Sequence, residues 1–273
     1  MGTILAGGTI PSSGGTSGGS GGSSRGSSAI TPASDFSSMW WNPSESGWGI
    51  DVTQHGSSFF AAWYAYNDNG WSTWLVMPGG TWTSPTTITG NLYRTTGPSS
   101  NGPFNPAQVH STIVGTATLS FQGTTGRAVL SYTVDGISGT KAIQREMFGP
   151  ADTNAVPNYS DLWWNASESG WGLTINQQYS TIFALLYTYG PYGAPAWYSL
   201  PGGTWTSANT YTGTLYSTTV PAANFYASAF NAASLSVTPV GTMTLQFGST
   251  SSATLTYSIN GQVFTKAITR EPF

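Results

Sequence analysis

The chain carries nearly the same sequence twice. Residues 35–148 contain WWNPSESGWGI, PGGTWTS, VGTATLSF and GTKAIQREMF, and residues 159–273 contain WWNASESGWGL, PGGTWTS, VGTMTLQF and FTKAITREPF in the same order. Each copy has about 110 residues, the size of an ordinary domain that can bury its own core. The duplication therefore predicts two homologous domains in tandem. Positions that both copies retain serve either the shared fold or a shared site.

Two segments outside the copies have the composition of linkers. Residues 1–34 include the run SSGGTSGGSGGSSRGSS, which has too little apolar surface to fold, so we expect a flexible stretch there. Residues 149–158, GPADTNAVPN, hold two prolines and are predicted to join the domains. A Gly/Ser-rich stalk before compact domains is typical of secreted and cell-envelope proteins, and it predicts an extracellular or periplasmic location.

The composition favours β-structure throughout both copies. Only 6% of residues are charged, against about 25% in ordinary domains, and 14% are aromatic. Thr, Tyr and Trp pack well on a pleated surface. Each copy reads as about seven or eight short strands separated by turns rich in Gly, Pro, Asn and Ser, with no sustained helical spacing. We therefore predict an all-β chain of two small antiparallel meanders, each closed into a β-barrel; a sandwich is the alternative.

Several classes of function are disfavoured by the residues present. The net charge of −3 provides no basic stripe, so nucleic acid is not an expected partner. The chain has no cysteine, and its two histidines, His55 and His110, are not matched by histidines in the second copy. We therefore predict no metal site, no cofactor and no hydrolytic triad. No apolar run approaches the ~20 residues of a membrane helix, so no membrane span is expected. The oligomeric state is left open.

Alternation along the first two strands predicts which side chains point into each barrel. Trp48, Ile50 and Val52 alternate with small or polar residues, which indicates a strand with one buried face. On the next strand one face is retained between the copies and the other is not. The retained residues are Phe60, Tyr64 and Tyr66, which recur as Phe183, Tyr187 and Tyr189. We expect this retained face to point inward, where Tyr64 and Tyr187 would meet a ligand.

Charged residues retained in both copies are the best site candidates, because charges are scarce. They are Glu45, Lys141, Arg145 and Glu146, which recur as Glu168, Lys266, Arg270 and Glu271. Strand parity places Lys141 and Arg145 on one face and Glu146 on the other. A buried lysine needs a partner, and Glu45 is the natural one. The favoured interpretation is a structural ion pair at each barrel mouth. A polar anchor for a ligand and a pair of catalytic carboxylates are the alternatives.

Two resemblances attach to these motifs. Gly47-Trp48 with Arg145, and Gly170-Trp171 with Arg270, resemble the calycin barrels, lipocalins and avidins. The resemblance implies that the arginine of the last strand packs over Trp48 in the first copy and over Trp171 in the second, closing each barrel. The WWNPxESGWG…KAI.R pattern is also similar to a tandem repeat of secreted bacterial proteins.

The favoured function is a non-catalytic binding or adhesion module that takes a glycan or a small apolar molecule. Retained tryptophans suit stacking on a ligand, and duplication raises avidity. The candidate ligand-binding residues are Glu45, Trp48, Tyr64, Lys141 and Arg145, with their counterparts Glu168, Trp171, Tyr187, Lys266 and Arg270. One alternative is a polysaccharide hydrolase that uses Glu45 and Glu168. Another is an outer-membrane β-barrel, favoured by the low charge and the terminal Phe273.

Overall fold

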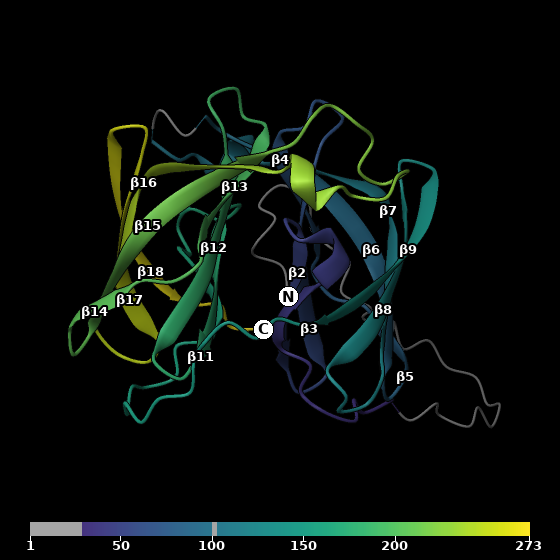
Figure 1. The fold of residues 1–273 in the computed structure, drawn as a ribbon, viewed down its shortest axis with the longest axis horizontal. Coiled ribbons are helices and arrows are strands. Elements are labelled where there is room, and N and C mark those ends of the chain that lie inside the picture. The colour runs from purple at the N-terminus through teal and green to yellow at the C-terminus, as the bar shows by residue number, and fades with distance from the viewer. Residues whose placement is uncertain (1–28, 100–102) are drawn as a thin grey trace, which may run out of the picture.

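The computed structural model of the chain describes residues 29–99 and 103–273, so most of the predicted flexible stretch lies outside the described residues. The fold is all-β and consists of two closed eight-stranded antiparallel barrels in tandem, as the sequence predicted (Figure 1). Strands β1–β9 lie within residues 35–148, and strands β10–β18 lie within residues 159–273.

The first barrel follows a meander. Its strands are β1 (Ser38–Trp41), β2 (Gly49–His55), β3 (Ser58–Tyr66), β4 (Ser72–Met77), β5 (Thr81–Ser84), β6 (Thr87–Thr96), β7 (His110–Phe121), β8 (Arg127–Val134) and β9 (Ile137–Arg145). The order in the sheet is β4-β3-β2-β1-β9-β8-β7-β6, and pairing of β4 with β6 closes the barrel, while β5 flanks β6. Two single 3-10 turns, η1 (Pro43–Glu45) and η2 (Pro106–Gln108), lie between strands.

The second barrel repeats this topology. Its strands are β10 (Asp161–Trp164), β11 (Gly172–Gln178), β12 (Thr181–Tyr189), β13 (Pro195–Leu200), β14 (Thr204–Ser207), β15 (Thr210–Thr219), β16 (Ser236–Phe247), β17 (Ser252–Ile259) and β18 (Gln262–Arg270), with the 3-10 turn η3 (Ala232–Ser234) before β16. Pairing of β13 with β15 closes it in the same way. The sequence repeat is therefore also a structural repeat.

The interior of the first barrel is filled by side chains. Ile50, on the face of β2 predicted to point inward, meets Trp63, Leu119 and Leu130 from other strands around a residual space of about 10 Å³. Such a space holds at most one water molecule. The barrel interior is therefore a packed core rather than a ligand cavity.

The prediction that the retained face of the second strand points inward is wrong. Ile50 pairs with Trp63 and Gly49 pairs with Tyr64, so Trp63 lies inside the barrel and Tyr64 lies on its outer surface. The Tyr64 hydroxyl lies 3.1 Å from the hydroxyl of Thr174 in the second barrel. The retained aromatic face is an interface between the barrels, and this gives a second physical reason for both copies to keep it.

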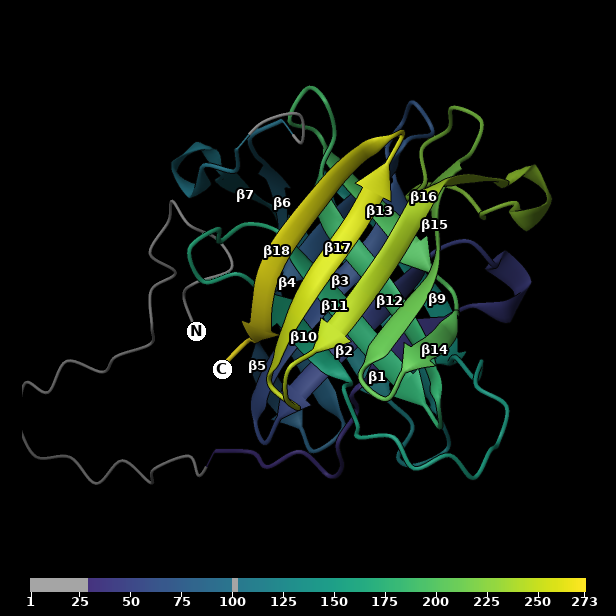
Figure 2. The same cartoon turned by 90° about the vertical axis from the view of Figure 1, so that its left-hand side faces the viewer.

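The two barrels lie side by side with β2–β4 and β11–β13 as the facing walls (Figures 1 and 2). Equivalent tryptophans bond across this interface in both directions. The indole N–H of Trp74 donates to the carbonyl of Thr188 (2.9 Å), and that of Trp197 donates to the carbonyl of Ala65 (3.1 Å). The copies are thus related by an approximate two-fold arrangement, in which the equivalent tryptophans Trp74 and Trp197 make reciprocal contacts.

Each barrel also sends a loop over the mouth of its neighbour. Phe225, between β15 and β16, packs edge-on against Trp48 of the first barrel at a centroid distance of 5.8 Å. In return Val109, between β6 and β7, lies so close to Gly170 that a Cβ there would approach it to 2.5 Å. Gly170 also has a φ of +128°, so only glycine suits this position. The retained glycine of the Gly-Trp motif therefore serves the contact between barrels.

Candidate functional site

The predicted ion pairs are present at both barrel mouths. Lys141 Nζ lies 2.7 Å from Glu45 Oε2, and the indole N–H of Trp48 donates to the same oxygen (3.0 Å). In the second barrel Lys266 Nζ lies 2.7 Å from Glu168 Oε1. The 3-10 turn η1, capped by the side chain of Asn42, holds Glu45 in place. The pairing of retained charges within each copy, predicted from strand parity, is confirmed.

The two ion pairs differ in how far they are exposed to solvent. The Lys141 side chain is 6% exposed because it lies beneath Trp48 and Phe225, with Nζ 5.0 and 5.3 Å from the two ring centroids. The backbone N–H of Phe230 also donates to Glu45 (3.4 Å). The Lys266 side chain is 19% exposed. The first ion pair is thus sealed by the second barrel, and its carboxylate receives three donors.

The retained arginines pack on a different tryptophan from the predicted one. Arg145 lies over Trp40, with its guanidinium carbon 4.9 Å from the ring centroid, and Arg270 lies over Trp163 at 5.6 Å. The expected contact with Trp48 is wrong because β1, not β2, is the neighbour of β9, and Trp40 pairs directly with Arg145. The arginine also donates to the carbonyl of Ser37 (2.8 Å). It fastens the chain at the start of β1.

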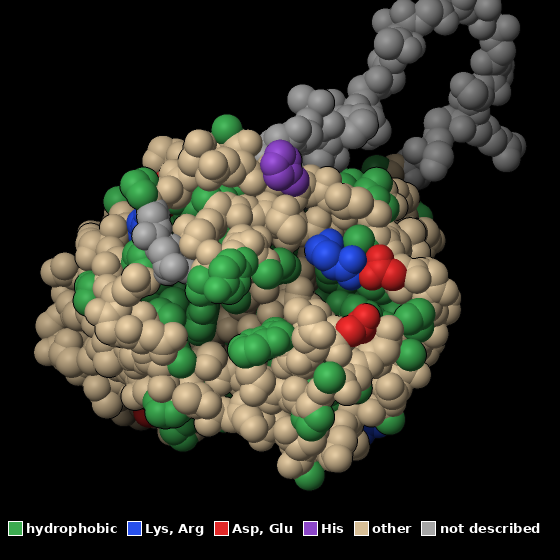
Figure 3. Space-filling model, turned by 90° about the horizontal axis from the view of Figure 1, so that it is seen from above, with side chains coloured by type: hydrophobic (Ala, Val, Ile, Leu, Met, Phe, Trp, Pro, Cys, Tyr) green, Lys and Arg blue, Asp and Glu red, His purple; other side chains and the backbone are tan. Residues whose placement is uncertain are grey.

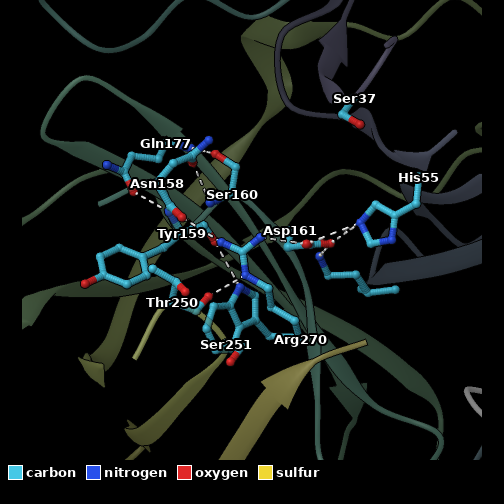
Figure 4. A network of polar contacts seen from close by, with 12 residues as sticks. Ser37, His55, Asn158, Tyr159, Ser160, Asp161, Gln177, Thr250, Ser251 and Arg270 are labelled. Carbon is cyan, nitrogen blue, oxygen red and sulfur yellow. Dashed lines mark hydrogen bonds and ion pairs between the residues drawn. The ribbon is translucent and has the colours of Figure 1, made fainter. Parts of the chain in front are cut away.

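A polar cleft of about 490 Å³ lies between the barrels at the His55 end of β2. Figure 4 shows its central network: Asp161 accepts a bond from Arg270 Nη1 (2.9 Å) and lies 3.1 Å from His55 Nε2. The His55 ring stacks on Phe273 at 4.4 Å. The bond between Asp161 and Arg270 lies within the second copy, whereas the contacts of His55 with Asp161 and Phe273 join the two copies. Only the relative placement of the barrels, which the sequence does not contain, could have indicated the contacts of His55.

Asp51 also lines the polar cleft. It is 2% exposed, and Asn176 donates a hydrogen bond to its carboxyl. Burial raises the pKa of Asp51 to about 7. The counterpart of Asp51 is Thr174 and that of His55 is Gln178, so these two groups have no titratable counterparts in the second copy.

A second cavity, here called the inter-barrel groove, has a volume of about 330 Å³ and lies at the Trp48 end of β2. Its aromatic lining comes from both barrels: Trp41, Trp48 and Tyr64 from the first, and Phe183, Trp197 and Tyr216 from the second. Of the predicted site residues, Trp48 and Tyr64 meet in this groove. Their counterparts Trp171 and Tyr187 do not line it, and neither do the four predicted lysines and arginines.

Few polar groups face the inter-barrel groove. Among the described residues that line it, Glu146 is the only charged one, and no ion pair joins it to another described residue. Burial raises the pKa of Glu146 to about 7. The indole N–H of Trp41 is buried and has no hydrogen-bond partner among the described residues. Strand parity predicts that Glu146 points out of the barrel. The groove itself could not be predicted from the sequence, because its walls come from both copies.

The outer face seen from above is largely uncharged. Figure 3 shows hydrophobic side chains gathered around a hollow in the middle of this face, with few charged side chains. Two exposed aromatic residues occupy equivalent hairpins: Trp71 (63% exposed) lies between β3 and β4, and Tyr192 (98% exposed) between β12 and β13.

No family model, curated protein or solved structure matches this chain. Among the described residues, no cluster of His, Asp and Glu side chains is arranged to hold a metal ion. Within the same residues, no helix is long and apolar enough to cross a membrane.

Proposed function

We propose that the chain is a non-catalytic binding module of a secreted or cell-envelope protein and that it takes a small ligand with an apolar body in the inter-barrel groove. The observation that carries this proposal is the aromatic lining of a cavity of about 330 Å³ between two barrels. Ligand sites are commonly concave, mostly apolar cavities of about 300–1,000 Å³ with a few placed polar groups. The groove has these properties, whereas the interior of the first barrel is filled.

The lining favours an apolar molecule over a glycan. Aromatic rings stack on sugars as well as on apolar groups, but a glycan also needs many hydrogen-bond partners for its hydroxyls. The polar side chains that line the groove are Ser46, Tyr64, Glu146, Ser199, Tyr216 and Thr218. This set suits one polar headgroup on an otherwise apolar ligand.

The hydrolase alternative receives less support. Glu45 and Glu168 lie in different barrels, and each carboxylate is held by a lysine and by the indole N–H of a tryptophan. A general acid or base must reach the reacting atoms of a substrate. Both carboxylates instead stabilise barrel mouths.

Titration with decanol and with soluble oligosaccharides, followed by intrinsic tryptophan fluorescence, tests the proposal. We expect saturable binding of decanol that Tyr216→Ala weakens about tenfold, since a lost ring contact is worth on the order of 1.4 kcal/mol. Tyr93→Ala is the matched control, because Tyr93 is the counterpart of Tyr216 and does not line the groove. Saturable binding of oligosaccharides without binding of decanol would replace the apolar ligand with a glycan. Saturation by neither class would sink the proposal.

A further inference from the structure

We propose that the inter-barrel groove selects cationic amphiphiles, with an ammonium headgroup held between the Glu146 carboxylate and the aromatic rings of the groove. This inference rests on the proposed function and names the ligand class for the same site. The ligand would carry a quaternary ammonium or protonated amine beside an apolar chain or ring.

The carboxylate of Glu146 has no counter-ion among the described residues. The backbone N–H of Glu146 donates to the carbonyl of Met39 (2.8 Å), and this bond holds Glu146 beside Met39 of β1, directly after the end of β9. The neighbouring Arg145 points to the other side of the strand, where it covers Trp40 and donates to the carbonyls of Ser37 and Asp35. No described basic side chain lines the groove. A partly buried carboxylate without a counter-ion favours a ligand that supplies one.

Many of the other side chains that line the groove are aromatic. Trp41, Trp48, Trp197, Tyr64 and Tyr216 present π-systems to a single cavity, and aromatic faces attract cations by their negative quadrupole. Trp48 already binds a cation in this way at the barrel mouth, where Lys141 Nζ lies 5.0 Å from its ring centroid. A carboxylate among aromatic rings repels an anionic headgroup. A neutral headgroup is not repelled, but it forms no ion pair with the Glu146 carboxylate.

The affinity of the groove for a cation should depend on pH. The titratable groups that line the groove are Glu146, Tyr64 and Tyr216, and Gln178, which donates to the backbone carbonyl of Glu146, carries no charge. Burial raises the pKa of Glu146 to about 7 and that of Tyr64 well above its usual value. A quaternary ammonium does not titrate, so its affinity should rise as the pH increases through about 7 and Glu146 ionises. Asp51 titrates in the same range, but it lines the polar cleft at the other end of β2.

Calorimetric titration with three probes of equal chain length tests this inference: decyltrimethylammonium, decanol and decanoate, each below its micelle concentration. At about pH 8 we expect the cation to bind about tenfold more tightly than decanol and decanoate to bind most weakly. Glu146→Gln should remove the preference for the cation and flatten its pH profile between about pH 6 and pH 8. Glu271→Gln is the matched control, because Glu271 is the counterpart of Glu146 and does not line the groove. This variant should keep the preference for the cation and the pH dependence of its affinity.

The outcomes separate the inference from the proposed function. If decanol binds as tightly as the cation, or if Glu146→Gln leaves the preference intact, the charge selection is wrong while the binding site stands. If none of the three probes binds, the proposed function fails as well. Thermal melting of both variants establishes that they fold. If Glu146→Gln does not fold, the comparison of the three headgroups on the unmodified chain still decides.

Discussion

At the residue scale, equivalent positions in the two copies have different surroundings. Glu45 and Glu168 form the same bonds within their own barrels, yet among the described residues only Glu45 also accepts a bond from the other copy, from the backbone N–H of Phe230. The sequence predicted both ion pairs, because strand parity and scarcity of charge suffice for contacts within one barrel. It could not predict which pair is sealed, because the cover comes from a loop of the other copy.

The variants Glu45→Gln and Glu168→Gln compare the contributions of the two ion pairs to the stability of the same chain. Glu45→Gln leaves Lys141 buried without a counter-charge, and breaking a buried pair costs about 3–5 kcal/mol of unfolding free energy. Glu168→Gln should cost about 1–2 kcal/mol, because Lys266 is partly exposed to solvent. Urea denaturation measures both values. Equal losses for the two variants would contradict the claim that the second barrel seals the first ion pair.

The buried Asp51 predicts a pH-dependent stability. Its pKa is raised from 3.8 to about 7 in the folded chain, so the unfolded chain releases this proton at lower pH than the folded chain does. The stability associated with the protonated carboxyl is present below about pH 4 and is lost as the pH rises to about 7. Asp51→Asn should therefore gain stability relative to the unmodified chain over this window, by about 4 kcal/mol at most. Melting temperatures of the two proteins that stay parallel from pH 4 to pH 8 would refute the assignment.

At the scale of elements, alternation predicted the inward face of β2 correctly, whereas retention between the copies predicted the wrong inward face for β3. For β2 the apolar face points into the barrel, as Ile50 shows. For β3 both faces are buried, one in the barrel and one against the other barrel, so alternation had no exposed face to detect. Retention of Tyr64 and Tyr66 reflected the interface, because both copies present this face to each other. A single sequence does not distinguish these two reasons for retention.

The loop that carries Phe225 should contribute strongly to stability. Phe225 is 5% exposed and its ring lies against Trp48, Trp63 and Tyr66 of the first barrel. Phe225→Ala should lower the unfolding free energy by about 3–5 kcal/mol, as for other buried phenylalanines. Tyr192→Ala is the control, because its side chain is almost fully exposed and should change stability by less than about 0.5 kcal/mol. A loss of similar size in both variants, measured in urea, would mean that the loop does not seal the barrel.

At the scale of the whole molecule, the two cavities of interest exist only because the barrels face each other. The sequence predicted two β-barrels in tandem, since repeat length, composition and turns determine that architecture. It gave no sign of the inter-barrel groove or the polar cleft, whose walls come from residues of both copies. The sequence therefore predicts that Trp48 and Tyr64 point into a barrel, although both line the cavity between the barrels.

The approximate two-fold arrangement makes a prediction for an isolated half. Residues 159–273, expressed alone, should fold and give a structured near-UV circular dichroism spectrum, because the barrel closes on itself. The fragment exposes Trp197, Tyr187 and Tyr189, which the first barrel normally covers. We expect it to form a homodimer, since the same face on two copies is self-complementary. Sedimentation should show a dimer, and a stable monomer at high concentration would contradict the shared interface.

The central claim is that the groove between the barrels, and not a barrel interior, binds the ligand. A crystal structure of the chain with a bromine-labelled decanol tests it directly, because anomalous scattering locates the bromine without regard to the surrounding model. The account predicts a bromine peak between the two barrels, among Trp41, Trp48 and Trp197. A peak inside the first barrel, beside Trp63 and Leu130, or in the polar cleft beside His55 would contradict it.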